Sequence, residues 1–422
     1  MPVPSPGVRP GPRLFRGWVV VAGAFLILFM AYGTQYAFGV FFAALIDEFG
    51  WSRASLSGVF SLYAFSYAAF ALVSGRLTDR WGPRAVIAIG GVLLGLGLIA
   101  MSGVRALWQP YVCYGLVAAL GMSTAYVPCN ATVAKWFTRR RGLAIGLASA
   151  GGSLGTFVLP PVAHVVVSRL GWRSAYVIFG VAVLIALNAL AVLMRRDPET
   201  IGLGPDGDPR HHGATARPEG WTVGRAMRTR AFWMLFAVFG ATWIPVFVPL
   251  VHLVPMARGL GIAPLLAATL VSAVGGAALV GRLVMGGASD RIGRRTALAV
   301  ALVLQAGAFV GFALARELPG LYAASLLFGF SYGGGSTLFP AAVADFFGRE
   351  AAASLAGLLF ALAGSMAAWG PLAAGLIYDR AGDYRLAWWL CAGFNALALG
   401  LLAFARPPAA PSPRLTPPAA LA

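Results

Sequence analysis

Long apolar stretches separated by short polar loops dominate the chain. A run of about twenty apolar residues is long enough to cross a hydrocarbon core of about 30 Å as a helix, and a helix satisfies its own backbone hydrogen bonds there. The pattern predicts about twelve such helices, near residues 18–43, 54–75, 85–104, 108–134, 143–167, 174–194, 231–256, 263–287, 296–315, 319–345, 353–377 and 386–405. The chain is therefore predicted to be an all-α membrane protein.

Composition and charge agree with this reading. Hydrophobic residues make up 59% of the chain and charged residues 11%, whereas a soluble globular chain has about 45–50% and about 25%. Most of the 32 Lys and Arg fall in the amino-terminal tail and in alternate loops, so the positive-inside rule predicts that both termini are cytoplasmic. Because the basic residues follow the topology, the net charge of +18 does not indicate a nucleic-acid partner.

The amino-terminal residues 1–13 are proline-rich and lack an apolar core, so we expect the first span to act as its own insertion signal. The expected location is the plasma membrane, specifically a bacterial inner membrane. A polar stretch, residues 195–230, divides the spans six and six and is typical of a linker. The expected organisation is a cytoplasmic tail (1–17), a six-helix bundle (18–194), a cytoplasmic linker (195–230), a second six-helix bundle (231–405) and a cytoplasmic tail (406–422).

An internal repeat supports the division into halves. The stretch GRLTDRWGPR at residues 75–84 recurs as GGASDRIGRR at residues 286–295. Its glycines allow a tight turn between helices, and its aspartates can pair with arginines or cap a helix. Such a charged cluster can latch one conformation of two halves that rock against each other, and the expected latch residues are Asp79, Arg80, Arg84, Asp290, Arg291 and Arg294. The alternative is that these arginines only set the topology.

Twelve spans, a central linker and this repeat resemble the major facilitator superfamily, whose loop signature G-x-L-x-D-R-x-G-x-R both copies match at the acidic, basic and glycine positions. The resemblance implies two pseudo-symmetric six-helix bundles. Residues 136–151, WFTRRRGLAIGLASAG, further resemble the signature of the monocarboxylate transporter family, with Arg139 in place of a lysine. That family and its bacterial relatives, which include lactate transporters and oxalate/formate exchangers, carry small carboxylates. The small residues of this segment are expected to pack against a neighbouring helix and not to bind substrate.

Arg282 is expected to lie within the eighth span. Burying an arginine there costs about 3 kcal/mol on insertion scales, so such a residue is functional by default. Its planar, permanently charged guanidinium matches a carboxylate, and no Asp or Glu lies in the interior of the predicted spans to pair with it. Snorkelling to the membrane surface and pairing with a structural acid are the alternatives. In the resemblance, an arginine at this position binds the carboxylate of the substrate.

Other polar and aromatic residues could complete a pocket around Arg282. His252 can donate a hydrogen bond and titrates near neutral pH, so it could carry a proton, although a histidine near a span end can also be interfacial. The remaining candidates are aromatic or amide side chains that could equally be packing or aromatic-belt residues, namely Tyr126, Tyr332, Asn130, Phe360 and Tyr36.

The sequence also departs from its relatives. Span one has no lysine and Ala278 replaces an aspartate, both of which are linked to proton coupling in animal carriers, and the lysine of span eleven in oxalate exchangers is absent. We therefore expect alternating-access transport of a monocarboxylate such as L-lactate or pyruvate, with a proton, and leave uniport open. The alternatives are an oxalate/formate-type anion exchanger and an exporter of drugs or lipophilic compounds, which should have an acidic residue in its cavity.

Chemistry of other kinds is not expected. The three cysteines, Cys113, Cys129 and Cys391, match no metal or redox spacing, so neither a metal nor a cofactor is predicted. An enzyme would need paired acid and base groups or an activated nucleophile, and a sensor would need a soluble domain. The expected partners are a small carboxylate, a proton and membrane lipid, and the expected state is a monomer.

Overall fold

The computed structural model describes residues 15–137, 140–207 and 221–408, and every regular element within them is helical. The amino-terminal half contains α1 (Arg16–Tyr36), α2 (Phe38–Phe49), α3 (Arg53–Trp81), α4 (Pro83–Met101), α5 (Trp108–Pro110), the π-helical η1 (Tyr111–Ala118), α6 (Ala119–Ser123), α7 (Tyr126–Trp136) and α8 (Arg141–Ala191). The short 3₁₀ helices η2 (Pro198–Ile201) and η3 (Pro205–Gly207) follow. The carboxy-terminal half contains α9 (Val223–Met227), α10 (Arg230–Trp243), α11 (Val248–Gly259), α12 (Pro264–Ile292), α13 (Arg294–Leu314), α14 (Leu318–Met366), α15 (Trp369–Ala381) and α16 (Arg385–Phe404).

Ten helical segments of the described residues are long and apolar enough to cross a membrane. One of them, Leu143–Ala191, holds both the fifth and the sixth predicted span, because the expected loop between them is reduced to a break at Gly171 (φ 77°, ψ 157°). The tenth predicted span, 319–345, is helical within α14 but is not among the ten segments. Its stretch SYGGGST at residues 331–337 lowers its hydropathy.

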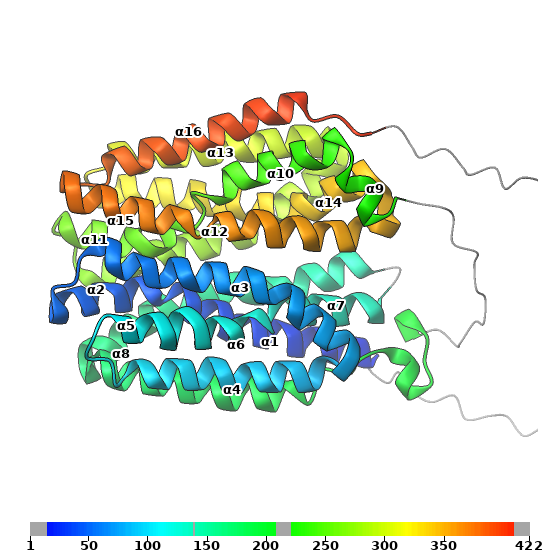
Figure 1. Ribbon diagram of the computed structural model, residues 1–422, viewed down its shortest axis with the longest axis horizontal. Coiled ribbons are helices and arrows are strands. Elements are labelled where there is room, and N and C mark those ends of the chain that lie inside the picture. The colour runs from blue at the N-terminus through cyan, green and yellow to red at the C-terminus, as the bar shows by residue number, and fades with distance from the viewer. Residues whose placement is uncertain (1–14, 138–139, 208–220, 409–422) are drawn as a thin grey trace, which may run out of the picture.

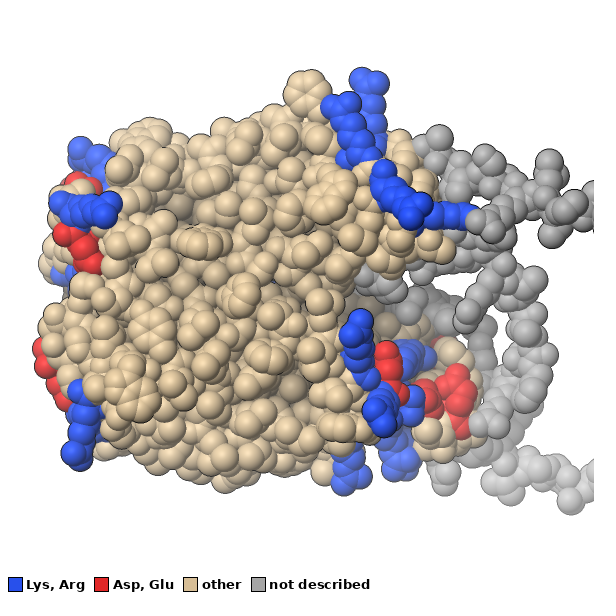
Figure 2. Space-filling view, viewed as in Figure 1, with Lys and Arg blue, Asp and Glu red and all other residues tan. Residues whose placement is uncertain are grey.

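The helices form two bundles that lie side by side with their axes roughly parallel (Figure 1). We call α1–α8 the N-terminal bundle and α9–α16 the C-terminal bundle. The linker end of the molecule carries the end of α8 and the start of α10, and the far end carries the end of α2 and the start of α3. On the face drawn in Figure 2, Lys, Arg, Asp and Glu gather at these two ends and leave an uncharged band between them, as expected for a chain surrounded by lipid.

The two copies of the repeated loop turn sharply at a glycine. Gly82 joins α3 to α4 with φ 84° and ψ 160°, and Gly293 joins α12 to α13 with φ 84° and ψ 144°. A residue with a Cβ rarely adopts a positive φ, so glycine is required at both turns. The sequence-based expectation of a tight helix-to-helix turn is confirmed at these positions.

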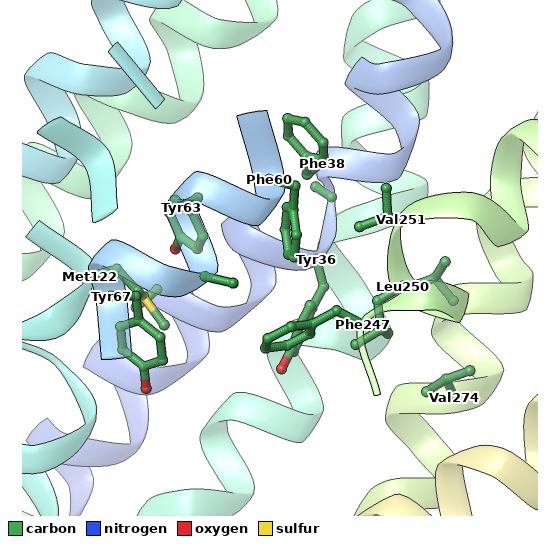
Figure 3. Packing of buried hydrophobic residues seen from close by; sticks show 14 of the residues in the cluster. Tyr36, Phe38, Phe60, Tyr63, Tyr67, Met122, Phe247, Leu250, Val251 and Val274 are labelled. Carbon is green, nitrogen blue, oxygen red and sulfur yellow. The ribbon is translucent and has the colours of Figure 1, made fainter. Parts of the chain in front are cut away.

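The buried apolar side chains form two clusters, of which only one includes residues of both bundles. The larger cluster runs through the N-terminal bundle and continues across the interface into the far half of the C-terminal bundle. Phe60 of α3, for example, lies 5.4 Å from Phe247 between ring centroids, next to Leu250 and Val251 of α11 (Figure 3). The smaller cluster lies wholly in the linker half of the C-terminal bundle. The bundles therefore share one apolar core at the far end only.

Candidate functional site

Arg282 lies on α12, partly buried, and faces the N-terminal bundle. Its Nη1 donates a hydrogen bond of 3.1 Å to the backbone carbonyl of Ser149 on α8, whereas its Nε is buried without a hydrogen-bond partner. The described part of the chain gives the guanidinium no ion pair with a carboxylate. The site therefore holds a positive charge with an unused donor, which an anionic ligand could satisfy.

The approach of α8 and α12 that brings Arg282 to Ser149 depends on glycine. A Cβ added at Gly275 of α12 would lie 2.5 Å from the backbone nitrogen of Phe157 and 2.9 Å from the carbonyl of Ser153, both on α8. Such contacts exclude any larger residue unless the helices move apart. Small residues thus let the backbones of the two bundles meet two helical turns before the arginine.

Two pairs of tyrosine hydroxyls lie at or beside the interface of the bundles. The hydroxyls of Tyr36 and Tyr332 are 3.1 Å apart and join the two bundles, and those of Tyr32 and Tyr67 are 3.1 Å apart within the N-terminal bundle. The rings of Tyr32 and Tyr36 lie 5.7 Å apart, so the two pairs are neighbours. Each pair uses only one of its two O–H donors internally, which leaves the second available to a ligand.

Two further aromatic side chains, Tyr126 and Phe360, pack against this group of tyrosines. Tyr126 of α7 stacks on Phe360 of α14 with centroids 5.9 Å apart, so this contact also crosses between the bundles. Tyr126 lies 6.1 Å from Tyr32, and Phe360 lies 5.2 Å from Trp243 and 6.3 Å from Tyr67. The structure therefore brings four of the sequence-predicted side chains, Tyr36, Tyr126, Tyr332 and Phe360, into one group between the bundles.

Asn130 reaches the site indirectly. Its Oδ1 accepts a hydrogen bond of 3.2 Å from the hydroxyl of Ser149, and its Nδ2 donates to the carbonyl of Tyr126 on its own helix. Ser149 in turn accepts the bond from Arg282. Sequence reasoning did not single out Ser149, Tyr32 or Tyr67 as site residues. Tyr32 was detectable, because it lies one helical turn before Tyr36 on the same face.

His252 lies elsewhere, in the seam between the bundles at the far end. It is fully buried, and its Nδ1 lies 3.0 Å from the hydroxyl of Tyr384. Its Nε2 lies 2.9 Å from the carbonyl of Pro371 and 3.2 Å from the hydroxyl of Ser57 on α3. All contacts are satisfied together when Tyr384 donates to Nδ1 and the Nε2–H donates to Pro371. A neutral histidine thus helps to join α3 to the C-terminal bundle.

Arg53 and Asp379 complete this far-end seal. The carboxylate of Asp379 on α15 accepts the backbone N–H groups of Arg53 (3.1 Å) and Ala54 (2.8 Å), so it caps the first turn of α3 from the opposite bundle. The guanidinium of Arg53 donates to the Tyr384 hydroxyl at 2.7 Å and lies 3.9 Å above the ring of Tyr378. Burial raises the pKa of Tyr384, so its hydroxyl stays protonated and can donate to His252.

A second polar contact crosses the seam at the same end. Arg258, at the end of α11, pairs with Asp47, at the end of α2, at 2.8 Å. The backbones also approach closely there, since a Cβ at Gly375 would lie 2.8 Å from the Cα of Ala54. The ion pair of Arg258 and Asp47 thus crosses between the bundles at the far end, next to the seal.

The predicted latch residues make contacts within their own bundles. Asp79 pairs with Lys135 at 3.4 Å, and Arg294 lies 3.9 Å from Asp345 while donating to the hydroxyl of Ser289. The remaining latch candidates Arg80, Arg84 and Arg291 have no ion pair in the described part of the chain, and the side chain of Asp290 lies outside the described residues. No latch contact between the bundles is seen among the described side chains at the linker end.

Residues 15–137, 140–207 and 221–408 hold no group of His, Cys, Asp or Glu suited to a metal ion.

Two helical bundles of membrane-spanning length, with the unpaired Arg282 between them, are typical of a membrane transporter, and the chain belongs to the Major Facilitator Superfamily, whose family model matches residues 24–371 and 244–420. It is similar to monocarboxylate transporter 12 of Rattus norvegicus, with 28% identity over 92% of this chain and 85% of that protein. It is also similar to monocarboxylate transporter 11 of Homo sapiens, with 30% identity over 94% of this chain and 84% of that protein. The chain is thus a transporter related to the monocarboxylate transporters, and the expectation that it is not an enzyme is confirmed.

Solved structures share the fold. A bacterial homologue of the human lysosomal transporter Spinster, in an inward-facing and unoccupied conformation, matches with a TM-score of 0.76 and 15% identity over 94% of this chain and 98% of that chain. A mutant of the nucleoside transporter NupG matches with a TM-score of 0.71 and 12% identity over 92% of this chain and 99% of that chain. The predicted major facilitator fold is therefore confirmed.

Proposed function

We propose that this protein moves a small monocarboxylate, of the L-lactate or pyruvate type, across the membrane by alternating access and together with a proton. The observation that carries the proposal is Arg282, whose buried Nε has no partner at an interface lined by tyrosine hydroxyls. A carboxylate would accept from that Nε and from a neighbouring guanidinium N–H, as the planar fork allows. A drug or lipophilic cation would instead require an acidic side chain, and the described surroundings of Arg282 supply none.

The distribution of contacts between the bundles supports alternating access. The shared apolar core and the seal of Arg53, His252, Asp379 and Tyr384 hold the far end closed, whereas the linker half of the C-terminal bundle has its own core. Two bundles joined at one end can rock about the site between them. We propose that this conformation admits substrate from the linker end, that the latch residues join the bundles when that end closes, and that the linker end is cytoplasmic, because the arginines concentrate there.

Two groups could carry the cotransported proton. One is the substrate carboxylate itself, and the other is His252, which would have to leave the seal of Tyr384, Pro371 and Ser57 to exchange a proton with the site. Uptake that an inward proton gradient drives would indicate symport, with either carrier, and uptake that ignores the gradient would indicate uniport. If a His252 variant keeps gradient-driven uptake, the substrate carries the proton; if it loses it, His252 does.

The test is uptake of radiolabelled L-lactate into proteoliposomes, with and without an inward proton gradient, for wild type and for Arg282→Lys. Lysine keeps the positive charge but lacks the planar fork, so we expect saturable uptake by the wild type and loss of at least about tenfold in the variant. Arg316→Lys, an exposed arginine at the far end, is the matched control and should transport normally. Uptake that survives Arg282→Lys would contradict the assigned site, and no uptake of any short carboxylate would contradict the substrate class.

A further inference from the structure

An open pocket of about 330 Å³ lies at the linker end of the C-terminal bundle, away from Arg282. It lies between the first turn of α10 and the residues that follow α16, two helices that pack against each other (Figure 1). Its walls are Thr229, Arg230, Ala231, Met234, Phe404, Arg406 and Pro408. The pocket therefore combines two guanidinium groups with an apolar wall.

The two arginines of the pocket have no carboxylate partner among the described residues. Arg230 and Arg406 are both exposed, and neither pairs with a carboxylate in the described part of the chain. Nearby, Arg294 lies close to Asp345, and Arg295 donates to the carbonyl of Ala403. The pocket also contains the amino-terminal turn of a fourteen-residue helix, α10, whose dipole adds positive potential. An anion placed there would meet two charge-assisted donors.

The apolar side chains around the pocket place it at the membrane surface. Phe404 is 68% exposed and Trp233, one turn into α10, is 49% exposed, which is costly in water and favourable in lipid. The Trp233 indole donates at 2.9 Å to the carbonyl of Met227, so its polar edge faces the linker end while its rings face outward. Tryptophans with this arrangement lie at the level of the lipid headgroups. The arginines beside it are therefore within reach of headgroup phosphates.

We propose that this pocket binds one anionic phospholipid of the leaflet on the linker side. The phosphodiester accepts from the guanidinium groups of Arg230 and Arg406, and an acyl chain lies along Met234 and Phe404. The lipid then joins the start of α10 to the end of α16 and fixes the point where the linker enters the C-terminal bundle. Charge complementarity favours this occupant over a zwitterionic lipid, and the apolar wall favours it over free phosphate.

The experiment uses the purified full-length chain in neutral detergent. Native mass spectrometry measures binding of phosphatidylglycerol, of phosphatidylcholine with the same acyl chains, and of inorganic phosphate. The test variant is Arg230→Gln/Arg406→Gln. The matched control is Arg316→Gln/Arg385→Gln, which removes two exposed arginines from the far end of the same bundle.

We expect wild type and the control to bind phosphatidylglycerol in preference to phosphatidylcholine, and the test variant to bind it at least about tenfold more weakly. Equal binding by the test variant, or equal affinity for the two lipids, would overturn the proposal and leave the arginines with a topological role only. Displacement of phosphatidylglycerol by millimolar inorganic phosphate would also overturn it, because the site would then be one for small anions. Arg230→Gln alone gives the same comparison if the double variant does not fold.

Discussion

The cap that Asp379 places on α3 gives a direct test of the far-end seal. Both carboxylate oxygens accept backbone N–H groups of the opposite bundle, at 3.1 Å from Arg53 and 2.8 Å from Ala54, so Asp379→Ala removes two hydrogen bonds that exist only while the far end is closed. Loss of a helix cap costs about 0.5–2 kcal/mol. Because Asp379 is exposed, water can hydrogen-bond to the freed N–H groups and offset part of this cost. We therefore expect Asp379→Ala to destabilise the far-closed conformation by about 1 kcal/mol.

This cost falls on one conformation only. A change of about 1 kcal/mol shifts a two-state equilibrium by about fivefold, since 1.4 kcal/mol corresponds to tenfold. The far-open population of Asp379→Ala should therefore rise about fivefold relative to wild type. Global stability should change little, because α3 keeps the local cap that Ser52 provides to Ser55 at 3.1 Å.

The assay is double electron–electron resonance between nitroxides at two exposed far-end positions, Arg105 of the N-terminal bundle and Arg316 of the C-terminal bundle. Both are changed to cysteine in a chain whose three native cysteines are replaced by serine. Asp379→Ala should increase the long-distance fraction. The matched control is Asp383→Ala, which removes a far-end carboxylate that accepts only from Arg385 within its own bundle, at 2.9 Å. No change in Asp379→Ala, or an equal change in the control, would refute the reasoning.

Three further outcomes follow from the same contacts. Gly375→Ala should open the far end more than Asp379→Ala does, because its Cβ would lie 2.8 Å from the Cα of Ala54; the same nitroxide pair reports it, and Gly393→Ala, with nothing within 4 Å, should not. His252→Phe should leave the KM for L-lactate within about twofold while raising the far-open fraction, if the histidine acts through the seal; a tenfold or larger rise in KM would return it to the substrate site. A double-mutant cycle of Tyr36→Phe and Tyr332→Phe on transport should show a coupling of about 0.5–1.5 kcal/mol, because their hydroxyls are 3.1 Å apart, and additive effects would contradict that bond.

The sequence was sufficient for the fold. Apolar runs predicted the helices, and the repeated loop predicted tight turns at Gly82 and Gly293. It was less informative where one residue decides the local structure. The loop expected near 168–173 is a break at Gly171 alone, since a single positive φ is enough to separate two helical axes without polar spacer residues. Hydropathy cannot distinguish a short polar loop from a break at a single glycine.

Contacts between helices far apart in the sequence were not predictable from the pattern. Periodicity gives the helix face of Tyr36, Tyr126 and Tyr332, and these side chains do lie in one group between the bundles. The same reasoning placed His252 with them, because nothing in one helix shows that Ser57 and Tyr384 surround it instead. The seal depends on which ends of the two bundles meet, which is a property of one conformation and has no signature in a single sequence.

Under the proposed function, the bond between Arg282 and Ser149 would link the binding of an anion to the movement of the bundles. In this conformation the guanidinium on α12 is held by a carbonyl of α8, so one of its donors joins the two bundles while its Nε stays unpaired. Rocking the bundles without a ligand would remove the carbonyl and leave a partly buried charge with fewer partners, which is unfavourable. A carboxylate bound as proposed would supply those partners in either conformation. Loading should therefore lower the barrier to reorientation because it replaces a contact between the bundles with one that moves with α12.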